Sequence, residues 1–306
     1  MSGDDVPVTP GDIERAAERI RAYVRRTPVM VHGDVTLKLE LLQHAGSFKP
    51  RGAFNRVLSE RELPEAGLIA ASGGNHGAAL SFVGQQLGVR VEIFMPSSSP
   101  AIKRANIERF GAEVTVIDGY YDDAQREVEK RQAETGALMV HPYDHAETVA
   151  GQGTMAKELE EQVGQFDTLV VANGGGGFVA GQAAWFRDRV KIVAVEPELS
   201  QCLRPALLAG ERVPVQVGGI AADSLGAQLG AVPWAISRRF VDEAVLVADD
   251  DIRAAQRVMW SDLRLVVEPG GAAAYAALMT GAVPQRPGEK IVVVVCGSNC
   301  DPNSVM

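Results

Sequence analysis

The chain has 306 residues, of which 46% are apolar, and carries a formal net charge of −9 from 30 basic and 39 acidic side chains. This length predicts about two domains, with enough apolar residues for a substantial core. No basic stripe is present that could neutralise phosphates, which argues against a nucleic-acid partner. No apolar run is long enough to span a bilayer, so no membrane association is expected.

The cysteines and the N-terminus indicate a cellular compartment. Cys202, Cys296 and Cys300 form neither a disulfide framework nor a C-x-x-C redox motif. The opening residues, MSGDDVPVTP, lack a basic region followed by an apolar stretch, so no signal peptide is expected. These features predict a protein of the reducing cytoplasm.

The first predicted element is a helix that begins after Thr9. Thr9 is a favourable N-cap, Pro10 suits the first turn and Asp12 follows three residues after the cap. Apolar residues then recur at helical spacing along one face: Ile13, Ala16, Ala17, Ile20 and Val24. A short strand-like segment, residues 36–39, comes next.

Beyond this segment, short apolar runs typical of buried strands alternate with stretches of helical pattern. The predicted strands are 68–71, 91–95, 114–117, 138–140, 168–172, 192–195, 244–247 and 291–295. The predicted helices include 75–87, 100–110, 122–135 and 147–163. This alternation predicts an α/β fold with open parallel sheets covered by helices on both faces. Without a long linker between them, two domains would be interwoven.

Three glycine-containing turns follow predicted strands, at residues 72–77, 173–178 and 296–299. In open parallel sheets ligands bind beyond the carboxyl ends of the strands, so the three turns could converge on one site. Four successive glycines, 174–177, precede an Ala-rich helix and can direct several backbone N–H groups at one phosphate. The alternative is a flexible connection.

Lys49 lies between a predicted strand and an apolar-faced helix, and small residues and Phe48 precede it. Most lysines are solvated surface charges. A lysine brought into a pocket loses hydration and is more easily deprotonated, as Schiff-base chemistry requires. The sequence contains no G-x-S-x-G elbow, and its five histidines form no zinc-type pattern.

Taken together, these motifs resemble the threonine/serine dehydratase family. That family belongs to the tryptophan-synthase-β-like (fold type II) pyridoxal-phosphate enzymes and includes the serine racemases. The matching segments occur in family order at 38–40, 46–53, 72–76, 174–177, 195–197, 267–269 and 296–299. The resemblance implies a large cofactor-binding domain, residues 1–66 and 145–306, into which a small domain, residues 67–144, is inserted.

The resemblance also implies a role for each matching residue. Lys49 would carry pyridoxal 5'-phosphate as a Schiff base, with Phe48 close to the ring and Asn75 at the phenolic oxygen. The cofactor phosphate would bind Gly174, Gly175, Gly176, Gly177 and the Phe178 backbone, and Cys296 would face the pyridine nitrogen. The substrate carboxylate would bind backbone N–H groups of Ser72, Gly73, Gly74, Asn75 and His76.

The implied activity is dehydration of L-threonine, L-serine or a related β-hydroxy amino acid to a 2-oxo acid and ammonia. A thiol such as Cys296 cannot hold the pyridine nitrogen protonated, which favours rapid loss of a β-leaving group. A serine racemase, a β-replacement enzyme and a catalytically inactive binding protein are the alternatives. Gly73 argues against an efficient racemase, because racemases of the family place a second base, a serine, at this position. The family further suggests a homodimer.

Besides Gly73, two further positions depart from the family pattern. Glu196 matches the first ligand of a divalent-cation site found in some members, but Cys202 stands where a second acidic ligand would be expected. No metal is therefore expected. Ser224 replaces the usual glycine after Asp223. The resemblance therefore does not determine which substrate side chain the enzyme prefers.

Overall fold

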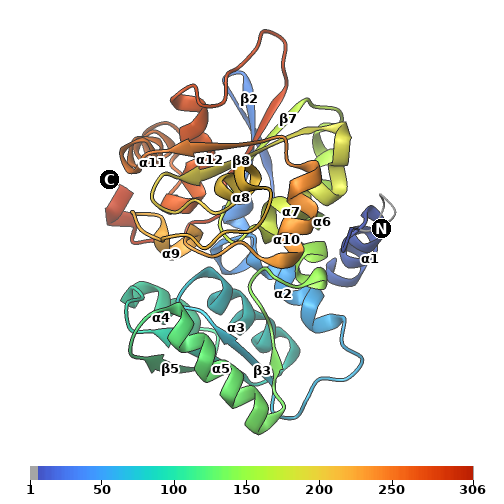
Figure 1. Ribbon diagram of the computed structural model, residues 1–306, viewed down its shortest axis with the longest axis vertical. Coiled ribbons are helices and arrows are strands. Elements are labelled where there is room, and N and C mark those ends of the chain that lie inside the picture. Colours follow the sequence, from blue (N-terminus) through green and yellow to red (C-terminus); the bar gives the residue numbers. More distant parts are fainter. Residues whose placement is uncertain (1–5, 306) are drawn as a thin grey trace.

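The computed structural model describes residues 6–305 and shows two sheets, each packed with its own helices (Figure 1). Residues 1–5, which belong to the segment predicted to lack a signal peptide, and residue 306 lie outside the described residues. Within the described part, no helix has both the length and the apolar character needed to cross a membrane.

The larger sheet has six strands. In sheet order they are β1 (Val29–His32), β2 (Val35–Lys38), β10 (Ile291–Val294), β7 (Thr168–Ala172), β8 (Lys191–Pro197) and β9 (Glu243–Val247). All neighbours are parallel except β1, which pairs with β2 in antiparallel register. The sequence did not predict β1. It is joined to β2 by a two-residue turn in which Gly33 has a φ of 58°, and it is too short to show a clear alternation.

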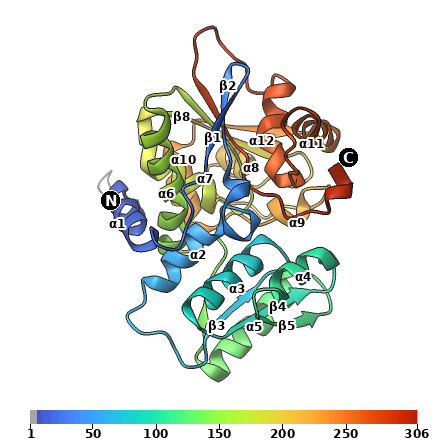
Figure 2. The same cartoon turned by 180° about the vertical axis from the view of Figure 1, so that it is seen from behind.

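Helices cover both faces of this sheet, with α11 and α12 on one side and α6, α7 and α10 on the other (Figures 1 and 2). Their bounds are α1 (Pro10–Ile20), α2 (Lys49–Leu58), α6 (Ala146–Val163), α7 (Gly177–Phe186), α8 (Leu203–Ala209), α9 (Ala222–Leu225), α10 (Ala231–Phe240), α11 (Asp249–Leu263) and α12 (Pro269–Met279). Thr9 caps α1 as predicted, since its side chain accepts from the Asp12 N–H and the Asp12 carboxylate accepts from the Thr9 N–H.

The smaller sheet has four parallel strands, in the order β5 (Glu113–Ile117), β4 (Val91–Pro96), β3 (Leu68–Ala71) and β6 (Leu138–Met139). Its helices are α3 (Asn75–Leu87), α4 (Ala101–Glu108) and α5 (Tyr121–Thr135). The strands of the larger sheet come from before and after this segment, so the chain leaves one sheet, builds the other and returns. The predicted α/β fold with two interwoven parallel sheets is confirmed.

Candidate active site

One pocket gathers residues from the start of α2 and from the carboxyl ends of β3, β7 and β10. Its lining consists of Phe48, Lys49, Asn75, Tyr143, Ala172, Gly174, Gly175, Gly176, Gly177, Phe178, Ser224, Leu225, Glu268, Gly270 and Cys296. Every residue that the sequence assigned to the cofactor is in this group. The sequence reasoning missed the roles of Tyr143 and Glu268 in the lining, although Glu268 stands in a segment that matches the family.

Lys49 is the first residue of α2, and its side chain is partly buried in the pocket. Its Nζ donates to the carbonyl oxygen of Pro142 at 3.0 Å and lies 5.2 Å from the centre of the Phe48 ring. Burial lowers the pKa of Lys49 to about 8, although Cys296 and Glu268 act in the opposite direction. A neutral amine is therefore accessible at mildly alkaline pH.

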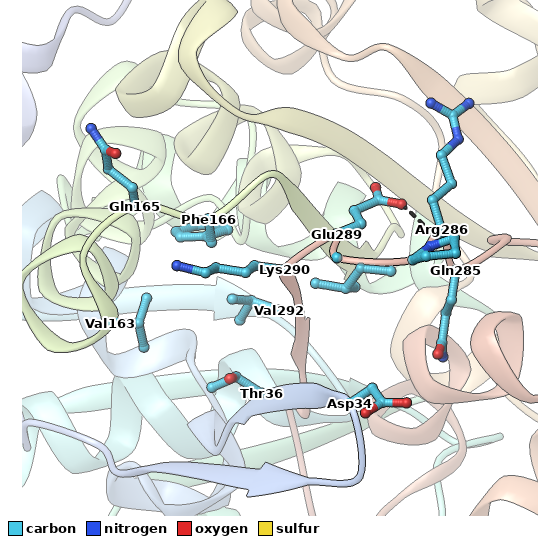
Figure 3. Close-up of a pocket in the computed structure, with 13 residues that line it drawn as sticks. Asp34, Thr36, Val163, Gln165, Phe166, Gln285, Arg286, Glu289, Lys290 and Val292 are labelled. Carbon is cyan, nitrogen blue, oxygen red and sulfur yellow. Dashed lines mark hydrogen bonds between the residues drawn. The ribbon is translucent and has the colours of Figure 1, made fainter.

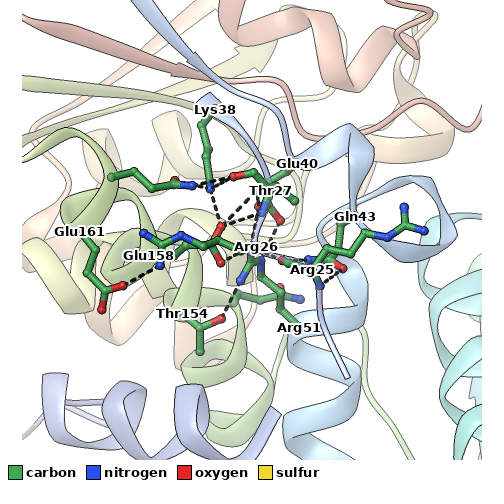
Figure 4. Close-up of polar contacts among 12 residues, drawn as sticks. Arg25, Arg26, Thr27, Lys38, Glu40, Gln43, Arg51, Thr154, Glu158 and Glu161 are labelled. Atoms are coloured by element: carbon green, nitrogen blue, oxygen red, sulfur yellow. Dashed lines mark hydrogen bonds and ion pairs between the residues drawn. The ribbon is translucent and has the colours of Figure 1, made fainter. Parts of the chain in front are cut away.

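A buried network of ion pairs anchors the start of α2 to the neighbouring elements (Figure 4). The Arg51 guanidinium makes two hydrogen bonds of 2.8 Å to the Glu40 carboxylate and one of 2.9 Å to Glu158 on α6. Lys38 at the end of β2 contacts the same Glu158 at 2.5 Å. Because Arg51 stands two residues after Lys49, these contacts fix α2 against β2 and α6.

The tetraglycine turn runs from the end of β7 into α7, and Gly176 within it has a φ of 94°. Among residues 6–305, the backbone N–H groups of Gly175, Gly176, Gly177 and Phe178 have no hydrogen-bond partner. Four free donors at the positive end of a helix are an arrangement that can bind an anion. The Tyr143 ring packs against the turn, since a Cβ on Gly175 would lie 2.5 Å from it.

Glu196 and Cys202 hold this turn by hydrogen bonds to Asn173 and Gly174. The Glu196 carboxylate accepts from Asn173 Nδ2 and from the backbone N–H groups of Cys202, Leu203 and Arg204, at 2.8 to 2.9 Å. The Cys202 thiol donates to the carbonyl oxygen of Gly174 at 3.0 Å. Residues 6–305 contain no cluster of three or more His, Cys, Asp or Glu side chains suited to a metal ion.

Cys296 follows β10 at the opposite wall of the pocket. Its thiol donates to the Gly270 carbonyl oxygen at 3.5 Å, and burial together with the nearby Glu268 raises its pKa. The thiol is therefore neutral at physiological pH.

Phe48 stacks on Phe178 with 3.8 Å between ring centres, which places the start of α2 against the start of α7.

The loop between β3 and α3 lies beside the pocket, and of residues 72–76 only Asn75 lines it. The Ser72 hydroxyl accepts from the N–H groups of Gly74 and Gly77 at 3.2 and 3.0 Å, so the Gly74 donor is already used. Within residues 6–305, the N–H groups of Gly73, Asn75 and His76 have no hydrogen-bond partner. The His76 ring is hydrogen-bonded to the Val140 carbonyl oxygen at 2.7 Å, and burial and Lys49 lower its pKa to about 3.

A different cavity, of about 560 Å³, lies at the amino ends of β2 and β10 (Figure 3). Asp34, Phe166 and Lys290 are among the residues that line it, and none of the predicted site residues is. Glu289 there accepts from the Thr168 hydroxyl at 2.6 Å and is occupied in joining the loop to β7.

Comparison with known proteins decides the family. The model for pyridoxal-phosphate dependent enzymes matches residues 20–297. The chain belongs to this family. It is 33% identical to a serine racemase of Arabidopsis thaliana, over 96% of this chain and 93% of that protein. It is 38% identical to a putative threonine dehydratase of Sinorhizobium fredii, over 94% and 91%. The structure of maize serine racemase matches with a TM-score of 0.93 and 31% identity, over 98% of this chain and 96% of that one.

The pocket of this family member fits pyridoxal phosphate. The four free N–H groups of residues 175–178 suit a phosphate, and the partly buried Lys49 amine suits the cofactor aldehyde. The neutral Cys296 thiol suits an unprotonated pyridine nitrogen. The three groups come from the start of α2, the turn into α7 and the end of β10, and they line one pocket.

Proposed function

We propose that this pyridoxal-phosphate-dependent enzyme is a dehydratase that converts L-serine, L-threonine or a related β-hydroxy amino acid to a 2-oxo acid and ammonia. The main support is that one pocket holds the Lys49 amine, with its lowered pKa, together with the neutral Cys296 thiol and the free N–H groups of the glycine turn. The similarity to a putative threonine dehydratase supports the same reaction.

Bound pyridoxal phosphate supplies an electron sink for the Cα–H bond of the amino acid. Lys49 takes the Cα proton as general base and returns a proton to the departing β-hydroxyl as general acid. The pKa of Lys49, about 8, lies close enough to neutral pH for both roles. The eliminated enamine then hydrolyses to the 2-oxo acid and ammonia.

The substrate carboxylate is proposed to bind at the amino end of α3. Gly73, Asn75 and His76 contribute backbone N–H groups there, and the helix adds its positive end. Gly73 carries no side chain that could act as a second base, which favours elimination over racemisation.

The test is 2-oxo acid release from L-serine and L-threonine by the wild-type protein and by Lys49→Ala, with Lys157→Ala, a partly exposed lysine on α6, as the control. We expect release that requires Lys49 but not Lys157. The dehydratase proposal is wrong if the wild-type protein binds pyridoxal phosphate but releases no 2-oxo acid from L-serine, L-threonine, 3-hydroxyaspartate or phenylserine. Rapid conversion of L-serine to D-serine would favour a racemase.

We also propose that residues 67–144 act as a small domain beside a large one, and that the enzyme is a cytoplasmic homodimer. The four-stranded sheet built between β3 and β6 supports the first point. The resemblance to the dehydratase family supports the dimer. Light scattering on the purified protein measures its mass, and the mass of a single chain would contradict the dimer.

A further inference from the structure

The side-chain amide of Asn75 is held at both ends. Its Nδ2 donates to Glu268 Oε1 at 2.5 Å, and its Oδ1 accepts from Asn299 Nδ2 at 2.7 Å. Asn299 Nδ2 also donates to the carbonyl oxygen of Ala45 at 2.7 Å. Carbonyl and carboxylate oxygens only accept, so this chain of contacts allows one orientation of the Asn75 amide. Within residues 6–305, the second Nδ2 hydrogen of Asn75 has no partner, so it is available to the pocket.

Glu268 has room for its carboxylate because glycine follows Cys296. A Cβ on Gly297 would lie 1.9 Å from Glu268 Oε1. Glu268 is the N-cap residue of α12, and its own N–H donates to the Gly297 carbonyl oxygen at 3.2 Å. The backbone of the turn after β10 thus fixes the position of the carboxylate that holds Asn75.

A positive charge from α4 opposes the burial that raises the pKa of Glu268. Lys103 on α4 lies 3.5 Å from Glu268 Oε2 and 2.7 Å from Asp223 Oδ2, and only 3% of its side chain is exposed. Asn75 also belongs to the smaller sheet, at the start of α3. Glu268 therefore contacts two residues from helices of the smaller sheet, Asn75 by a hydrogen bond and Lys103 by an ion pair.

We propose that Glu268 is a positioning residue for the cofactor, which acts through Asn75. It keeps the free Nδ2 hydrogen of Asn75 directed at the phenolic oxygen of pyridoxal phosphate, and Lys103 supplies the opposite charge that keeps the carboxylate in place. This inference rests on the proposed function and on the role at the phenolic oxygen that the family resemblance implies for Asn75. A neutral amide at position 268 can still accept from Asn75 Nδ2, but it carries no charge and can also donate, so it holds the Asn75 amide less firmly.

The test is the affinity of the cofactor-free protein for pyridoxal phosphate, measured by absorbance titration. We expect about tenfold weaker binding for Glu268→Gln, the size of one lost charged hydrogen bond. Asn299→Ala removes the contact at the other end of the amide and should act in the same direction. Glu243→Gln, which removes a surface carboxylate paired with Lys191, is the control. Circular dichroism checks that each variant folds.

The decisive comparison uses Asn75→Ala as the background. If Glu268 acts through Asn75, Glu268→Gln should weaken binding no further there. An equal loss in both backgrounds would overturn the inference, and so would unchanged affinity of a folded Glu268→Gln protein. Failure of the wild-type protein to bind pyridoxal phosphate would count against the proposed function instead.

Discussion

Ser99 fills the space that a side chain at position 73 would need. A Cβ on Gly73 would lie 1.7 Å from Ser99 Oγ and 2.6 Å from Ser99 Cβ. Ser99 follows β4, and its N–H donates to the Pro96 carbonyl oxygen at 3.0 Å, so the backbone holds it there. A side chain at position 73 is therefore incompatible with the side chain of Ser99 in its present position.

This relationship predicts that Gly73→Ser alone disrupts the loop. Overpacking of this kind typically costs about 1–3 kcal/mol. Gly73→Ser combined with Ser99→Gly should recover that stability in urea unfolding. Because the racemases of the family carry a serine at this position, the double variant should also form more D-serine than the wild-type protein, as measured by chiral chromatography. If the single variant is as stable as the wild type, the packing argument is wrong.

Arg51→Met should strongly destabilise the protein, because it leaves Glu40 buried without its guanidinium partner (Figure 4). Removing one member of a buried ion pair costs about 3–5 kcal/mol. Arg26→Met, which breaks an exposed pair with Glu161, should cost less than about 1 kcal/mol. Urea unfolding of both variants gives the comparison, and similar losses in the two would contradict it.

Glu40 also predicts how stability depends on acid. Burial would raise its pKa, but Arg51, Lys38 and the Thr27 hydroxyl together lower it below the ordinary value of 4.5. A carboxylate whose folded pKa is lowered stabilises the protein above the ordinary pKa, and this contribution is lost as the pH falls through the folded value. The free energy of unfolding should therefore decrease on acidification below pH 4.5. The decrease should be smaller in Arg51→Met.

Gly176→Ala should weaken binding of the cofactor phosphate. A residue with a Cβ is strained at the φ of 94°, and the Cβ would lie 2.7 Å from Pro233, so the turn must shift. Gly210→Ala is the control, since its φ is also positive, at 78°, but its Cβ would meet nothing within 4 Å. Titration should show weaker binding of pyridoxal phosphate to Gly176→Ala only. Binding of pyridoxal, which has no phosphate, should change little.

Cofactor uptake should follow the titration of Lys49. Only the neutral amine reacts with the cofactor aldehyde, and the pKa of about 8 makes it the major form above that pH. The rate of uptake by the cofactor-free protein should rise about tenfold per pH unit below the pKa and level off above it. Stopped-flow absorbance measures this rate. A midpoint near 10.5, the ordinary value for lysine, would show that burial does not lower the pKa of this amine.

The sequence predicted the main elements and the convergence of the strand ends, because both follow from local patterns. Short apolar runs set the strands, and parallel strands bring their carboxyl ends to one edge. The partners of Asn75 could not be predicted in this way, since Glu268 lies 193 residues further along the chain. Ser99 was missed because the clash with Gly73 depends on how two loops approach in space. The roles of the site residues remain predictions for the experiments above.

The pairing of β2 with β10 has a consequence for synthesis of the protein. Lys49 follows one of these strands and Cys296 the other, and the contact between Ala45 and Asn299 joins residues 254 positions apart. Contacts this distant in sequence form late and slow folding. A nascent chain in which β10 has not yet emerged from the ribosome lacks one wall of the pocket, even if its earlier elements have folded. Capture of the cofactor would then signal that the last strand has joined the sheet.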